Sequence, residues 1–107
     1  MDYIEELQDV IKRVQGVEST HVESVPIKET FQGKTVWEGV VEVFDLKGHT
    51  KTTRAYAWAY ETDNPKKPRH VVVLHFGTVT SPLLAVRAAI LEELKNNQAA
   101  AEPNKPA

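Results

Sequence analysis

Four side chains that could contact a partner alternate along one stretch of the chain. Arg54, Tyr56, Trp58 and Tyr60 are separated by single residues, so in a β-strand all four would lie on one face. An exposed row of aromatic rings can bind an apolar partner surface, and a row flanked by cations can stack the bases of single-stranded nucleic acid. We therefore take these four residues as the candidate partner-binding site.

The local charge gives nucleic-acid binding only weak support. Residues 32–76 hold seven Lys and Arg against five Asp and Glu, an excess of two positive charges, while the whole chain carries a net charge of −2. Such a balance creates no strong field toward nucleic acid or an anionic membrane. Single-stranded nucleic-acid binding by the four-residue face is therefore kept as an alternative to protein binding.

The histidines do not form a pattern of metal ligands. His21 and Glu23 are spaced to share a strand face, whereas His70 and His75 would fall on opposite faces of another strand, and His49 lies beside a turn glycine. Three ligands do not converge by local spacing, as a metal site requires. We expect neither a metal site nor a cofactor.

Acid–base and nucleophilic chemistry also lack a clear motif. Glu38 and Glu42 are too widely spaced for a coupled carboxylate pair, and a cross-strand partner such as Arg54 would make them surface ion pairs. Ser81 is explained as a helix cap, and the chain has no glycine-rich phosphate loop. The sequence favours a non-catalytic protein. Ligand binding or catalysis in a pocket between sheet and helices stays a second alternative, because distant residues can form an active site without a motif.

The composition excludes several classes of protein. The 107 residues include no cysteine, which rules out disulfides, thiolate zinc sites and a cysteine nucleophile. No apolar segment is long enough to span a bilayer, and the first residues lack the pattern of a secretory signal. We expect a cytoplasmic protein with no membrane partner.

Two helices are expected at the ends of the domain. Apolar residues recur at three- and four-residue spacings over residues 2–15, with Asp2 as the N-cap of a capping box and Gly16 as the stop. Ser81 and Pro82 are the preferred residue types for the start of a second helix, which we expect to end near residue 97.

Between the helices, alternating apolar residues predict four antiparallel strands joined mainly by short turns. Pro26 interrupts the first strand, which indicates an edge position or a bulge. Gly33 and Gly48 supply turns, and residues 63–68 form a polar loop. The expected fold is α+β: an N-terminal helix, a four-stranded antiparallel meander and a C-terminal helix (α-β-β-β-β-α), built as a two-layer sandwich. Residues 1–97 form one domain and residues 98–107 a flexible tail.

Neither face of this sheet is polar, although an antiparallel sheet with helices on one side normally has a polar outer face. In the third strand the small Ala55 and Ala57 lie on the face opposite Tyr56 and Trp58. A homodimer or another protein partner could cover the aromatic face; a curled sheet, or one helix on each face, would also do so. We therefore expect a small interaction module that self-associates or binds a protein through this face.

Overall fold

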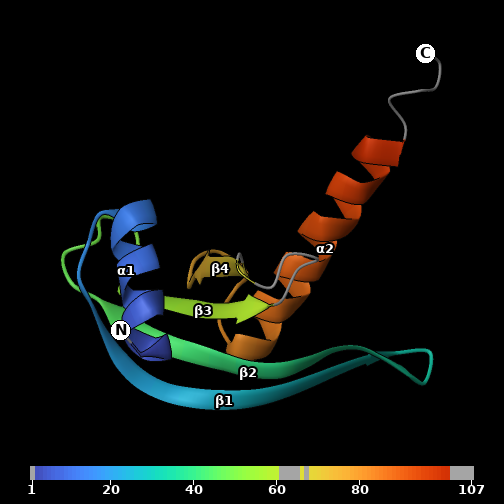
Figure 1. The fold of residues 1–107 in the computed structure, drawn as a ribbon, viewed down its shortest axis with the longest axis horizontal. Helices are drawn as coiled ribbons and strands as arrows, with labels where there is room; N and C mark the ends of the chain where they lie inside the picture. The colour runs from blue at the N-terminus through green and yellow to red at the C-terminus, as the bar shows by residue number, and fades with distance from the viewer. Residues whose placement is uncertain (1, 61–65, 67, 102–107) are drawn as a thin grey trace.

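The fold has the predicted order of elements. The computed structural model describes residues 2–60, 66 and 68–101, with the side chains of the last helix described as far as Glu93. Most of the predicted loop at residues 63–68 and the chain from residue 102 onward lie outside the described residues. The elements are α1 (Tyr3–Gln15), β1 (Ser19–Phe31), β2 (Lys34–Leu46), β3 (Arg54–Tyr60), β4 (Arg69–Leu74) and α2 (Pro82–Ala101) (Figure 1).

Local signals in the sequence determine both ends of α1 and the start of α2. The Asp2 carboxylate accepts a hydrogen bond from the Glu5 N–H at 2.8 Å. In turn, the Glu5 carboxylate accepts a hydrogen bond from the Asp2 N–H, which completes the capping box. Gly16 adopts φ 74°, the left-handed conformation that ends a helix. At α2, the Ser81 hydroxyl accepts the Leu84 N–H at 3.2 Å. The helix continues to Ala101, four residues beyond its expected end.

The four strands form one antiparallel meander in the order β1-β2-β3-β4. β1 is an edge strand, as Pro26 indicates, and a bulge lies between His21 and Glu23. β1 and β2 pair along their full lengths, but β2 pairs with β3 only from Glu42 to Asp45. The rest of the β1–β2 hairpin therefore projects beyond the body of the sheet (Figure 1).

Helix α1 packs on the face of the sheet that carries small side chains. Leu7 and Ile11 are fully buried against Ala55, Ala57 and Phe44. Alanine permits close approach of a helix, so apolar contact is extensive even though this helix is short. We call this side of the sheet the α1 face.

Helix α2 packs on the other face. Its buried Ala85 and Val86 contact a core cluster that includes Val43, Tyr56 and Trp58. Neighbouring residues of a strand point to opposite faces, so the alternation along β3 assigns the alanines to α1 and the aromatic rings to α2. We call this second side the α2 face.

The expected two-layer arrangement is therefore wrong, because the layers are helix, sheet and helix. The physical reason is the apolar character of both faces: each face buries its own side chains under one helix, an arrangement that the sequence left open as an alternative.

Candidate binding surfaces

The four candidate residues share the α2 face of β3, but α2 closes most of it. Tyr56 and Trp58 expose only 2% and 3% of their surfaces, whereas Arg54 is half-buried and Tyr60 is 38% exposed. The expectation that all these rings are open to a partner is wrong for Tyr56 and Trp58. A protein or a nucleic-acid base could reach them only if α2 moved away.

Trp58 is part of an aromatic core that joins the hairpin to the body of the sheet. Its ring meets Trp37 of β2 edge to face, with centroids 5.5 Å apart and planes at 71°. Trp37 in turn lies over Gly39, where an added Cβ would be 3.1 Å from the ring. Edge-to-face geometry is favourable for aromatic pairs, so the sequence pattern that suggested a docking surface is explained by an internal contact.

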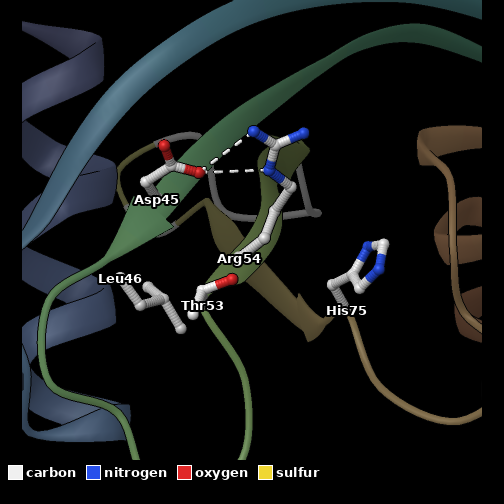
Figure 2. Close-up of a pocket in the computed structure, with 5 residues that line it drawn as sticks. All are labelled: Asp45, Leu46, Thr53, Arg54 and His75. Atoms are coloured by element: carbon white, nitrogen blue, oxygen red, sulfur yellow. Dashed lines mark hydrogen bonds and ion pairs between the residues drawn. The ribbon is translucent and has the colours of Figure 1, made fainter.

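Arg54 lies at an open cavity of about 520 Å³ at one end of the α2 face. The cavity is lined by Asp45, Leu46, Thr53, Arg54 and His75 (Figure 2). The Arg54 Nε and Nη2 atoms both lie 3.1 Å from the Asp45 Oδ1 atom. One carboxylate oxygen thus holds one edge of the guanidinium, and Figure 2 shows the remaining terminal nitrogen pointing away from Asp45.

The Tyr56 hydroxyl contacts His75 of the cavity lining, although the Tyr56 ring is buried. It lies 2.6 Å from the Nδ1 atom of His75, and the rings of the two residues are 5.9 Å apart. The Thr52 hydroxyl donates to the His75 carbonyl at 2.5 Å, and the His75 N–H donates to the Arg54 carbonyl at 2.9 Å. His75 is therefore fixed at both its backbone and its ring.

Burial makes the Tyr56 phenol harder to ionise. Loss of water around the phenol raises the pKa of Tyr56 above its ordinary value, and the nearby Arg54 charge opposes this shift only in part. The phenol is therefore neutral at ordinary pH and keeps its proton for a hydrogen bond.

A second polar cluster lies on the α1 face around Glu42, which is only 6% exposed. Its Oε1 atom lies 2.9 Å from the Nε2 atom of His21 and accepts a hydrogen bond from the Ser24 hydroxyl. The predicted surface pairing of Glu42 with Arg54 is wrong, since Arg54 pairs with Asp45 on the other face. The predicted pairing of His21 with Glu23 on one face is also wrong, because the bulge shifts the register between them.

Two further contacts fix α1 to the sheet. The Tyr3 hydroxyl accepts the Ala59 N–H at 2.9 Å, and the Nε2 atom of His70 lies 3.0 Å from the Glu6 carboxylate. Burial raises the pKa of Tyr3 more than the hydrogen bond from Ala59 lowers it. His70 of β4 thus faces α1, whereas His75, one residue beyond the end of β4, lines the cavity on the other side of the sheet.

The projecting hairpin is covered on its α2 face only. There, Arg87 of α2 forms an ion pair with Glu29 of β1, and the hydrogen bond from Arg87 lowers the pKa of Glu29. On the α1 face, the register places Pro26 opposite Val40 and Lys28 opposite Glu38.

These four α1-face residues line an open groove of about 330 Å³ together with Ile27 and Gly39. Val40 is 44% exposed, and Val36, further along β2, is 47% exposed. We call Pro26, Lys28, Glu38 and Val40 the hairpin patch. The sequence contains a signal for it, since alternation along β2 puts Val40 on the face opposite Trp37. What the sequence did not show is that α1 stops short of this end of the sheet.

Within the described part of the chain, no three His, Asp or Glu side chains are grouped to hold a metal ion. None of its helices combines the length and apolarity needed to cross a membrane. In comparisons with known proteins, the chain matches no family model, no curated protein and no solved structure.

Proposed function

We propose that this protein is a small interaction module that self-associates, and that two copies meet through the hairpin patch. The observation that carries the proposal is the groove at Pro26 and Val40, on the part of the α1 face that α1 leaves uncovered. Contiguous exposed apolar surface often marks an interaction site.

The occupant we propose is a second copy of the chain, because the charges of the patch are self-complementary. Lys28 and Glu38 face each other across the two strands, so a cation lies on one side of the groove and an anion on the other. In a two-fold dimer the same patch is used by both subunits. Rotation by 180° can then place Lys28 of each copy beside Glu38 of the other, around a central contact of Val40 with Val40.

Association along the strand edge is less favourable than association through the face. β1 presents the free edge beside this groove, but Pro26 has no N–H to donate and the bulge after His21 interrupts the ladder. Proline and bulges at an edge oppose the addition of another strand. The proposed dimer therefore buries side chains of the α1 face and leaves Tyr56 and Trp58 in their internal core.

Charge-reversal variants, measured first alone and then as a mixture, test this arrangement. Lys28→Glu gives a patch with two negative charges, and Glu38→Lys gives one with two positive charges. Each variant alone should self-associate at least about tenfold more weakly than the unmodified chain, because like charges meet across the interface. An equimolar mixture of the two should recover association, since one patch is then negative and the other positive.

Sedimentation velocity over micromolar concentrations measures the mass of the monomer and of the associated species directly. Lys12→Glu is the matched control, because Lys12 is an exposed lysine of α1 that pairs with Glu18 and lies outside the patch. It should leave self-association unchanged. A monomer mass for the unmodified chain at every concentration would overturn the proposal, and so would a mixture of the two charge variants that associates no better than either alone.

A further inference from the structure

Two nitrogen-bearing side chains, Arg54 and His75, line the cavity beside β3. Arg54 uses its Nε and Nη2 atoms on a single oxygen of Asp45, so its outer edge is turned away from that carboxylate (Figure 2). A guanidinium edge of this kind matches the two oxygens of a carboxylate or phosphate group. The Arg54 side chain is 37% exposed, which leaves this edge accessible.

The hydrogen bond with Tyr56 constrains the tautomer of the His75 ring. Among the described residues the Tyr56 hydroxyl has His75 as its hydrogen-bond partner, so the neutral phenol is satisfied by donating to the Nδ1 atom. A neutral imidazole that accepts at Nδ1 carries its proton on Nε2. His75 therefore has an Nε2–H group as its second polar site, and its side chain lines the cavity together with Arg54.

Asp45 orients the guanidinium and also limits what the cavity can take. Its single-oxygen contact fixes the plane of the Arg54 group, which reduces the entropy lost when a ligand is bound. The carboxylate is half-exposed and remains beside the cavity, so a highly charged ligand would be repelled. A small group with one or two negative charges fits these surroundings best.

We infer that Arg54 and His75 bind the oxyanion group of a small molecule, a carboxylate or a phosphate, with Arg54 contacting two of its oxygens and His75 donating from Nε2. This binding is independent of the proposed self-association. The cavity lies on the α2 face, and the hairpin patch lies on the α1 face.

Titration with inorganic phosphate and with malonate, followed by the amide resonances of residues 53–55 and 75–76, tests the inference. Sodium chloride keeps the ionic strength constant in every sample. We expect saturable shifts confined to these residues with at least one of the two probes, and the probe that binds more tightly identifies the kind of oxyanion. Arg54→Gln should weaken that binding about tenfold or more, because it removes a charge-assisted hydrogen bond.

Two further variants separate the site from general charge effects. Lys34→Gln removes an exposed cation at the far end of the hairpin and should leave the titration unchanged. Arg54→Lys keeps the charge without the two-nitrogen edge and should bind less well than the unmodified chain, which also covers the case of a poorly folded Arg54→Gln variant. Equal binding by all three variants and the unmodified chain would overturn the inference, as would shifts no larger than those given by chloride alone.

Discussion

Trp37 and Trp58 meet edge to face beneath α2, with their ring centroids 5.5 Å apart. Trp37 belongs to the projecting part of β2, and Trp58 belongs to β3 in the body of the sheet. Because β2 and β3 pair only from Glu42 to Asp45, this side-chain contact connects the hairpin with the core where the backbone ladder does not. The hairpin can therefore project and still be held in place.

Removal of the Trp58 ring should reduce the stability of the whole domain. We expect Trp58→Ala to lower the free energy of unfolding by about 3–5 kcal/mol, the usual range for deletion of a buried tryptophan side chain. Urea unfolding followed by far-ultraviolet circular dichroism measures this change. Tyr60→Ala is the matched control on the same strand face and should cost far less, since Tyr60 is 38% exposed. Similar losses for the two variants would contradict the assignment of Trp58 to the core.

An added methyl group at Gly39 should displace the ring of Trp37. A Cβ at this position would lie 3.1 Å from the Trp37 ring, closer than ordinary van der Waals contact. We expect Gly39→Ala to change the near-ultraviolet circular dichroism of the tryptophan pair and to cost about 1 kcal/mol of stability by overpacking. Thr30→Ala, at an exposed position of the same hairpin, should leave the aromatic signal unchanged. An unaltered spectrum for Gly39→Ala would show that the ring does not cover this residue.

Glu42 should contribute to stability as a buried group. Glu42→Ala leaves the side chains of His21 and Ser24 without their shared carboxylate, and we expect a loss of about 1–3 kcal/mol, the cost of unpaired polar groups. Glu38→Ala is the control, because Glu38 lies on the same face of β2 as Glu42 but is exposed. This variant should change stability by no more than about 0.5 kcal/mol. Thermal unfolding at low protein concentration compares the two variants. Equal effects would place Glu42 on the surface.

The raised pKa of Tyr56 predicts a loss of stability in strong alkali. Burial is the main cause of the shift, so the folded state holds the phenol proton more firmly than the unfolded chain does. The corresponding stabilisation is complete below the ordinary tyrosine pKa of 10.0 and is lost as the pH rises through the higher pKa of the folded state. Ultraviolet titration of the phenolates should show late ionisation of both Tyr3 and Tyr56, and Tyr56→Phe should remove the part of this late component that belongs to Tyr56. A titration unchanged by Tyr56→Phe would contradict the burial of this hydroxyl.

Features of the fold that depend on neighbouring residues could be predicted from the sequence. Asp2 and Gly16 mark the two ends of the first helix, because helix capping depends on residues within one turn. Ser81 marks the start of the second helix for the same reason. Pro26 indicated an edge strand because its missing N–H is a property of that residue alone. These assignments needed no knowledge of distant contacts.

The binding surfaces could not be predicted, because they depend on which helix covers which face. The apolar row at Tyr56 and Trp58 gives the same alternation whether a partner or α2 lies over it. The bulge after His21 is also invisible in the pattern, and it reverses the faces of the residues that follow. Ser24 therefore joins His21 beside the buried Glu42, a contact between two strands that local spacing does not reveal.

A dilution series of amide nuclear magnetic resonance spectra tests the central claim most directly, since it locates self-association residue by residue in the unmodified chain. We predict concentration-dependent shifts at the hairpin patch, including Lys28, Glu38 and Val40, with constant shifts from Arg54 to Tyr60. Shifts concentrated at Tyr56 and Trp58, or spectra that do not change with concentration, would contradict the claim that copies of this protein meet through the uncovered face of the hairpin.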